Sequence, residues 1–267
     1  MNKLLIAATV SLVSTTALAH DVWIKADRHE IHTDEQTTFS FDVSRSGTTL
    51  VAEANHGFKQ LFVTSPTGET SKNLVAFSGE TKEVYDINFD KRGRYYIQSP
   101  LSEVFLTIYE DSEGERQKTR MPKSKWHTLP KGSKPLKTVH KLITSETYVS
   151  YNGFSKIRVP STKGLVIKPL QHPSKLRPNQ KITFEITYNG QPVEAAEVTL
   201  SSSNQYLFED SEKIEKDLSK KDRGVFSFNV NKPGKYLLAV EQELELKNDP
   251  HATERSVEKY LTLEITE

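Results

Sequence analysis

The sequence predicts an all-β fold made of two β-sandwich modules in tandem. Three observations support this. Apolar and polar residues alternate with a period of two, and no segment carries apolar residues at helical spacing. In addition, a segment in one half of the chain is similar in sequence to a segment in the other half. Alternating runs rich in Val, Ile, Thr, Tyr and Phe, bounded by Gly, Pro, Asn and Asp, are typical of half-buried strands. The clearest runs are residues 37–43, 103–110, 181–188 and 225–230.

Residues 1–19 have the form of a cleaved signal peptide. A basic start at Lys3 precedes an apolar run over residues 4–13, and Ala17 and Ala19 are small residues where signal peptidase cuts. The apolar run is shorter than the roughly 20 residues that a membrane span needs. We therefore expect an exported, periplasmic protein whose mature chain begins at His20 and has no membrane span.

Composition and charge narrow the classes of partner. The chain has 36 Lys and Arg against 35 Asp and Glu, a formal net charge of +1, and Lys3 leaves with the signal peptide. A nearly neutral chain of mixed charge gives no reason to expect nucleic acid or an anionic membrane as a partner. There is no Cys, so the core has to stabilise the exported chain without disulfides. The length suits two domains.

An internal sequence repeat indicates the type of β-sandwich. The segments NFDKRGRYYI (88–97) and NVNKPGKYLL (229–238) share the spacing of Asn, Lys, Gly, a basic residue and Tyr. A tight turn at Gly before a strand that opens with Tyr is the layout of the corner between strands E and F of an immunoglobulin-like domain. There the Tyr hydroxyl bonds the main chain of the turn. Residues 34–43 and 178–187 each place a polar turn before a strand, and both landmarks recur in order at nearly equal spacing. We therefore expect two immunoglobulin-like modules.

The module boundaries follow from this repeat. We expect a first module at residues 20–158 and a second at residues 159–267. The first contains a polar, basic stretch near residues 111–137 with Pro and Gly, which we interpret as a long exposed loop between late strands.

Three further elements are expected near this boundary and after it. A strand within residues 141–153 closes the first module, and a strand within 164–173 opens the second. Residues 211–222 contain few apolar residues, and we interpret them as a strand and a turn that form a hairpin with residues 225–230.

No catalytic motif is present. The chain has no Cys nucleophile, no Gly-x-Ser-x-Gly elbow, no Gly-rich phosphate loop and no HExxH helix. The string HEIH at residues 29–32 falls in a strand context, where positions three apart point to opposite faces. We expect a protein that is not an enzyme and has no catalytic residues, and we do not expect that short element alone to hold one metal between His29 and His32.

His20 is the strongest candidate metal ligand. As a new amino terminus it has an α-amine with a pKa of about 8 and an imidazole with a pKa of about 6.5. The amine and Nδ1 can close a chelate ring on one ion. Nitrogen donors of this type suit Ni(II), Co(II), Cu(II) and Zn(II), with the intrinsic order of affinity peaking at copper.

A second imidazole would complete the site. His56 is the first candidate, because it lies in a turn-like Asn-His-Gly context from which a loop can present a side chain. His29 and His32 come next, since they lie on a strand that we expect near the new terminus. His127 is a further candidate. The segment 249–254, which holds Asp249, His251 and Glu254, is expected to be a hairpin loop. A second, weak metal site is one interpretation of it, and a solvated turn is the simpler one.

Three stretches of the chain resemble a family of exported bacterial proteins of unknown function that is often labelled NikM-like. These are AHDVWIKA at residues 19–26, the run at residues 164–200, and YLTLEI at residues 260–265. The resemblance implies a periplasmic component associated with nickel or cobalt uptake transporters, and His20 is the one candidate ligand that matches the family's opening. His172, Asn179, Glu194 and Ala195 depart from the family's pattern at turn positions, which leaves the fold unaffected.

The leading hypothesis is therefore a periplasmic accessory protein that captures Ni(II) or Co(II), with Cu(II) as a further candidate, for an inner-membrane uptake transporter. The alternative is a non-catalytic exported module for protein interaction or adhesion, with no metal, because paired immunoglobulin-like domains present loops and edges to other proteins. A copper site acting on polysaccharides ranks last, because the chain has only two Trp for a flat aromatic face.

Overall fold

The structure is a computed structural model that describes residues 21–35, 37–46, 50–156, 163–203 and 213–267. The predicted signal peptide and His20 lie outside the described residues. Nearly all regular structure within them is β-strand, and the helical segments there are three short 3-10 turns, η1 (Lys123–Thr128), η2 (Pro173–Lys175) and η3 (Lys220–Asp222). The all-β prediction is confirmed.

One large sheet runs through the whole molecule. Its strand order is β16-β15-β18-β19-β11-β8-β4-β5. All neighbours in this order are antiparallel except β11 and β19, which pair in parallel from Val139 opposite Glu254 to Thr147 opposite Thr262. The strands are β4 (Gln60–Thr64), β5 (Thr70–Leu74), β8 (Gly93–Gln98), β11 (Lys134–Tyr151), β15 (Ala195–Ser202), β16 (Lys213–Ser219), β18 (Gly234–Glu245) and β19 (Glu254–Ile265).

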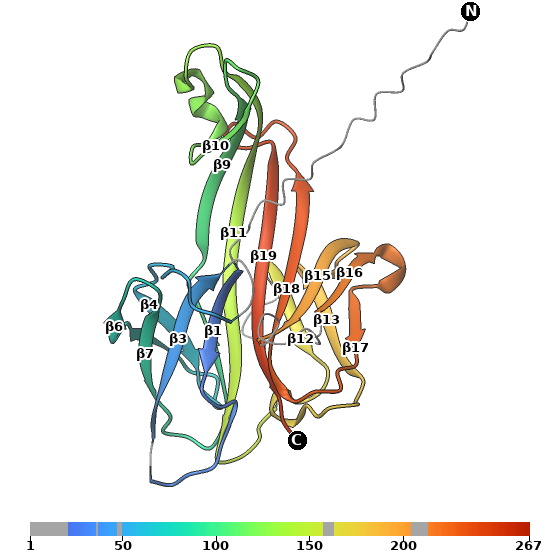
Figure 1. Cartoon of the computed structure of the whole chain (residues 1–267). Helices are drawn as coiled ribbons and strands as arrows, with labels where there is room; N and C mark the ends of the chain where they lie inside the picture. Colours follow the sequence, from blue (N-terminus) through green and yellow to red (C-terminus); the bar gives the residue numbers. More distant parts are fainter. Residues whose placement is uncertain (1–20, 36, 47–49, 157–162, 204–212) are drawn as a thin grey trace, which may run out of the picture.

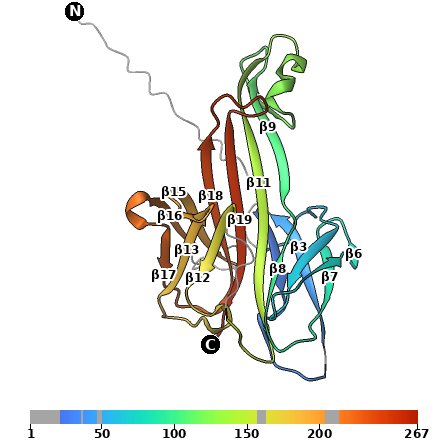
Figure 2. The same ribbon diagram turned by 180° about the vertical axis from the view of Figure 1, so that it is seen from behind.

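Two smaller sheets cover opposite faces of this central sheet (Figures 1 and 2). The first contains β1 (Asp21–Ala26), β3 (Thr38–Ser46), β7 (Glu83–Asn88) and β6 (Phe77–Ser78). The second contains β12 (Leu165–Pro169), β13 (Ile182–Tyr188), β14 (Gln191–Pro192) and β17 (Val225–Phe228).

Two hydrophobic cores result, one under each small sheet. Successive side chains of a strand point to opposite faces. Tyr95 accordingly belongs to the first core and Tyr96 to the second, and the same holds for Tyr260 and Leu261 on β19. We call the two halves the first and the second sandwich. They share the central sheet and are joined there by the pairing of β11 with β19.

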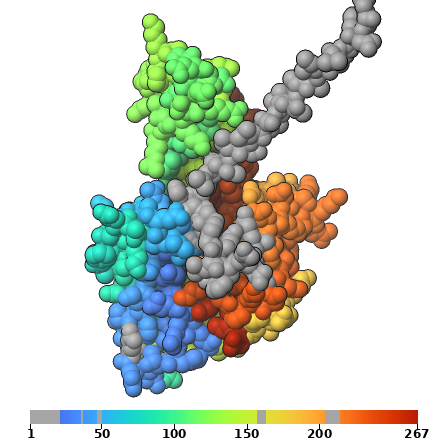
Figure 3. All heavy atoms as spheres, in the orientation of Figure 1, coloured from blue at the N-terminus to red at the C-terminus, as the bar shows by residue number. Residues whose placement is uncertain are grey.

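A third part, which we call the tower, projects from the two sandwiches (Figures 1 and 3). It contains β9 (Ser102–Glu110), β10 (Arg116–Thr119), η1, the first half of β11 and the far ends of β18 and β19. The prediction of a long exposed loop near residues 111–137 is therefore wrong in part. Those residues include β10, η1 and the start of β11, because β9 provides pairing partners on both of its edges.

Both expected tyrosine corners are present. The Tyr95 hydroxyl accepts a hydrogen bond from the Lys91 N–H at 2.8 Å and donates one to Asp90 at 3.1 Å. The Tyr236 hydroxyl donates to the Lys232 carbonyl at 2.9 Å. Each Tyr follows a glycine with positive φ, +128° at Gly93 and +149° at Gly234, a conformation that glycine adopts without the strain of a side chain.

The strands expected at the module boundary also form. β11 extends through residues 141–151, and β12 opens the second sandwich. Residues 213–219 form the strand predicted there, and η3 provides the turn. The prediction that this strand forms a hairpin with residues 225–230 is wrong. β16 pairs with β15 in the central sheet, whereas β17 (residues 225–228) pairs with β13. Leu218 and Phe226 enter the second core from two facing sheets, which a side-by-side pairing of their strands would prevent.

Candidate metal centre

The described part of the chain opens with β1, whose first residue is Asp21. Val22, Trp23 and Ile24 follow it directly and are all buried, and the indole N–H of Trp23 donates to Ser46 Oγ at 3.2 Å. β1 pairs with β3 along its whole length, from Asp21 opposite Ser46 to Ala26 opposite Phe41. The residue that precedes Asp21 is therefore attached to a fixed strand. That residue is His20, which lies outside the described residues.

One carboxylate contacts the phenol of Tyr260, and the charges of two others act on it from further away. The Tyr260 hydroxyl donates to Glu258 Oε2 at 3.0 Å. Burial raises the pKa of Tyr260 well above its ordinary value, and the negative charges of Glu258, Asp21 and Glu241 raise it further. The first residue of β1 is thus close to the acidic side chains of β18 and β19.

Glu258 and Glu241 belong to a row of four carboxylates that crosses the central sheet. Asp217 on β16 lies opposite Glu197 on β15, Glu197 lies opposite Glu241 on β18, and Glu241 lies opposite Glu258 on β19. Directly opposed residues on antiparallel strands project from the same face of a sheet. We call these four residues the carboxylate row. Glu197, Asp217 and Glu241 line a cleft of about 360 Å³ together with Glu243.

One lysine partly balances the carboxylate row. Lys141 Nζ lies 2.5 Å from Glu258 Oε1. Burial opposes the charge on this ammonium, yet Glu258, Glu241 and Glu243 together raise the pKa of Lys141. The pKa of Glu241 is also raised, first by burial and then by the charge of Glu258. Like charges directly opposite one another destabilise a sheet, so the row has a negative potential that a bound cation would relieve.

His29 is enclosed between the sandwiches. Its side chain is buried, Nδ1 lies 3.5 Å from Thr147 Oγ1, and Nε2 has no hydrogen-bond partner. Burial lowers the pKa of His29 to about 3, and the positive charge of Lys235 contributes in the same direction. The imidazole is neutral and therefore able to bind a metal, but the residue is only 2% exposed.

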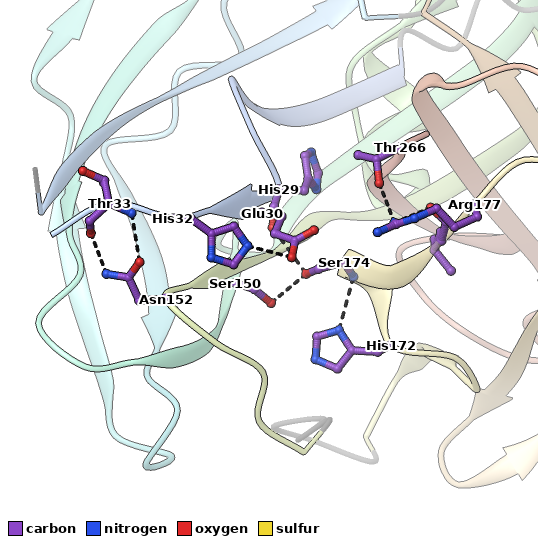
Figure 4. Close-up of polar contacts among 11 residues, drawn as sticks. His29, Glu30, His32, Thr33, Ser150, Asn152, His172, Ser174, Arg177 and Thr266 are labelled. Carbon is purple, nitrogen blue, oxygen red and sulfur yellow. Dashed lines mark hydrogen bonds and ion pairs between the residues drawn. The ribbon is translucent and has the colours of Figure 1, made fainter.

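His32 lies in different surroundings, at the surface on the other side of the two-residue strand β2 (Glu30–Ile31). Its side chain is 64% exposed, and Nε2 lies 2.9 Å from Glu30 Oε1. Figure 4 shows the rings of His29 and His32 pointing in different directions. His32 also borders a cleft of about 420 Å³ whose lining includes the opposite charges of Asp27 and Arg28.

His56 is half-buried on the connection between β3 and β4. Its ring centroid lies 4.3 Å from that of Phe58, and Nδ1 is buried without a hydrogen-bond partner. Burial lowers the pKa of His56 to about 4, and the charges of Arg45 and Arg120 contribute. A neutral imidazole suits a metal, but two neighbouring guanidinium groups oppose a divalent cation there.

The described residues do not bring the candidate histidines together. Within residues 21–267, less the gaps given above, no group of three or more His, Asp or Glu side chains is arranged to hold a metal ion. Asp249 and His251 lie in the hairpin loop between β18 and β19, where Asp249 Oδ1 accepts from the His251 and Ala252 N–H groups. Any site at the start of β1 therefore depends on His20, and the ligand roles of His20, His29, His32 and His56 stay predictions.

The sequence comparisons decide the family. A family model described as "Domain of unknown function (DUF4198)" matches residues 17–244. The chain belongs to the DUF4198 family. Its predicted membership of a family of unknown function is confirmed, and its link to nickel or cobalt uptake stays a prediction. No curated protein matches this DUF4198 chain. No helix among its described residues has the length and apolar character to cross a membrane.

Solved structures similar to the DUF4198 protein include three of low sequence identity. The D0-D1 domain of Intimin is 13% identical, with 92% of this chain and 98% of that chain covered and a TM-score of 0.23. The FN1-FN3 domains of chicken CNTN1 are 8% identical, with 91% and 98% covered and a TM-score of 0.23. A DUF3823 family protein from Bacteroides uniformis is 13% identical, with 92% and 100% covered and a TM-score of 0.24. At such low TM-scores the description of the fold rests on the strands of this chain itself.

Proposed function

We propose that this DUF4198 protein is a periplasmic metal-binding accessory protein. Its mature chain begins at His20, captures Ni(II) or Co(II), with Cu(II) as a further candidate, and passes the ion to an inner-membrane uptake transporter. The α-amine and Nδ1 of His20 are the primary ligands. The cargo and the transporter come from the NikM-like resemblance, whereas the location of the site comes from the residues around Asp21.

The position of Asp21 carries the proposal. Its charge acts on Tyr260, and Tyr260 donates to Glu258 at the end of the carboxylate row. Consecutive Cα atoms are about 3.8 Å apart, so a chelate on His20 lies within one residue of Asp21. The nitrogen donors and the acidic surface then meet at the start of β1.

The carboxylates and the nitrogen donors of this site contribute to metal binding in different ways. The carboxylates attract a divalent cation over several ångströms, and the amine and imidazole nitrogens form the bonds that favour late first-row metals over Mg(II) or Ca(II). Capture also has to be reversible if the ion is passed on. A terminal chelate with few protein ligands leaves coordination positions for a receiving site.

The deciding experiment is a calorimetric titration of mature protein that begins at His20 with Ni(II), Co(II), Cu(II) and Zn(II). The matched control has one extra Ala before His20, which converts the amine into an amide. Masking the amine is expected to weaken binding by tenfold or more, about 1.4 kcal/mol. Equal affinity for both proteins would refute the terminal chelate. Absence of binding at micromolar metal would favour the interaction module instead.

A second pair of variants tests the acidic surface. Glu197→Gln with Glu241→Gln removes two charges from the carboxylate row and is expected to weaken Ni(II) binding at low salt, with a smaller effect at high salt. The control, Glu113→Gln with Glu115→Gln, removes two charges from exposed residues between β9 and β10 in the tower. Equal effects of the two pairs would mean that only net charge matters, and the row would then have no special role.

A further inference from the structure

The two faces of the tower differ in what packs against them. The turn η1 packs on one face, where the indole N–H of Trp126 donates to Thr107 Oγ1 of β9 at 3.4 Å. Successive residues of a strand point to opposite faces, so Val104, Leu106 and Ile108 lie on the other face. All three are partly exposed and lie outside both hydrophobic cores. They form an apolar strip along β9.

Four basic residues flank this apolar strip. Each lies opposite Ile108 or Glu110 of β9, and directly opposed residues project from the same face of a sheet. Lys137 is 40% exposed, and the other three are exposed. The two on β10 form no ion pair within the described part of the chain. The four residues are Arg116 and Lys118 on β10 and Lys134 and Lys137 on β11.

Acidic residues occupy the other half of the same face. Lys141 lies opposite Val104, and its Nζ contacts Glu258 at the end of the carboxylate row, so the row and the apolar strip share one face of the sheet. Glu243 and Glu245 follow the row member Glu241 along β18 at intervals of two and therefore project from that face as well. The exposed acidic residues of this half are Glu197, Asp217, Glu243 and Glu245.

The boundary between the basic and the acidic half runs between β11 and β19, which lie side by side in Figures 1 and 2. Two ion pairs cross it. Lys137 Nζ lies 2.7 Å from Glu254 Oε2, and Lys141 Nζ lies 2.5 Å from Glu258 Oε1. We call the whole surface the bipolar face.

We infer that the bipolar face binds a second copy of this chain in a symmetric dimer. A two-fold axis along the boundary places the basic half of each copy over the acidic half of the other. An anionic membrane or a nucleic acid is repelled by the acidic half, and a uniformly basic partner is repelled by the basic half. A second copy carries both halves in the matching arrangement, and it also covers the apolar strip.

This inference does not rest on the proposed metal function. The dimer covers the carboxylate row, so dimerisation and the entry of a metal ion at the row oppose each other. The dimer can therefore exist whether or not the chain binds metal, and its test uses metal-free protein.

Sedimentation velocity of the mature protein tests the dimer. A dimer that depends on opposite charges is expected at about 50 mM NaCl, and its dissociation constant should rise by about tenfold or more at about 500 mM NaCl, because salt screens the attraction. Protein that stays monomeric at low salt and a concentration of about 100 μM would overturn the proposal.

Charge reversal locates the interface. Arg116→Glu with Lys118→Glu makes the basic half acidic, and Glu197→Lys with Glu243→Lys makes the acidic half basic. Each double variant alone is expected to dimerise about tenfold or more weakly than the wild type. An equimolar mixture of the two should form a mixed dimer, because unlike charges then face each other again. That recovery also shows that both variants are folded.

The matched control is Lys72→Glu with Lys181→Glu. It changes the net charge by as much as the first double variant, at exposed residues on β5 and beside β13 that lie outside the bipolar face. It should dimerise as the wild type does. Equal weakening in the control would overturn the proposal, and so would a mixture that stays monomeric although both variants have the circular dichroism spectrum of the wild type.

Discussion

Tyr95 and Tyr236 occupy equivalent corners of the two sandwiches, and the hydroxyl of each is hydrogen-bonded to the main chain four residues earlier. Both side chains are buried, one in each core. The two bonds differ in direction, because the Tyr95 hydroxyl accepts from an N–H and the Tyr236 hydroxyl donates to a carbonyl. The same corner thus fixes the entry of β8 and of β18 into the central sheet.

Removing either hydroxyl is expected to destabilise the protein. Tyr95→Phe leaves the Lys91 N–H without this partner and Tyr236→Phe leaves the Lys232 carbonyl without one, at a cost of about 1 kcal/mol each in the free energy of unfolding. Urea denaturation measures the cost. Tyr188→Phe, at a partly buried Tyr of the second sandwich, is the control and should change stability by less than about 0.5 kcal/mol. Equal losses in all three variants would show that the corners have no special role.

The buried pair of Glu146 and Lys259 predicts a strongly non-additive double mutant. The two side chains are 2% and 8% exposed, and Nζ lies 2.8 Å from Oε2. Lys259→Met leaves a buried carboxylate uncompensated, which is expected to cost about 3 kcal/mol. Adding Glu146→Leu removes that charge, so the double variant should be more stable than Lys259→Met alone. Simple addition of the two single costs in urea denaturation would contradict the pairing.

The imidazole of His29 makes folding sensitive to acid. Its pKa is about 3 in the folded chain against the ordinary 6.5, so the unfolded chain takes up the proton first as the pH falls. The free energy of unfolding is therefore unaffected above pH 6.5 and declines below it until about pH 3, by about 1.4 kcal/mol per pH unit for one such group. His56, with a pKa of about 4, acts in the same direction.

Urea denaturation at about pH 7.5 and about pH 5 tests this assignment. His29→Gln should lose less stability between the two pH values than the wild type does, whatever its stability at the higher pH. His32→Gln, at an exposed histidine of the same segment, should keep the wild-type loss. An unchanged loss in His29→Gln would mean that other groups cause the acid sensitivity.

The carboxylate row predicts a stabilising substitution in the absence of metal. Glu197 has a carboxylate opposite it on both neighbouring strands, Asp217 on one side and Glu241 on the other. Glu197→Gln is expected to raise the free energy of unfolding by a few tenths of a kcal/mol at low salt, and the gain should vanish at high salt. Glu185→Gln is expected to lower the free energy of unfolding slightly, because it removes an exposed ion pair with Lys168. A loss of stability in Glu197→Gln would contradict the repulsion.

Local patterns predicted the parts of this fold that depend on neighbouring residues. The spacing of Gly93 and Tyr95, repeated at Gly234 and Tyr236, was sufficient for both corners because the turn and its bond lie within a few residues. The pairing of β16 and the strands of the tower were not predictable in this way. The partners of β10 and β11 are set by tertiary packing, which overrides the polar, basic composition that suggested a loop.

For the candidate site, the sequence supplied only the proposal of His20 as a nitrogen ligand, which stays a prediction. Small residues before His20 indicate a cleavage site, and that signal is local. The carboxylate row comes from four strands between Asp217 and Glu258, and strand register alone brings its members together. The one local signal was the alternation of Glu241, Glu243 and Glu245 along β18, which indicates an acidic strand face but names no partner for it.

Anomalous diffraction at the nickel absorption edge, from crystals of mature protein that begins at His20 and is loaded with Ni(II), tests the metal proposal most directly. The proposal predicts a peak within bonding distance of the His20 α-amine and Nδ1, at the start of β1 beside Asp21 and Glu258. A peak at His251 in the hairpin loop, at His32 on the surface, or at no histidine would contradict it.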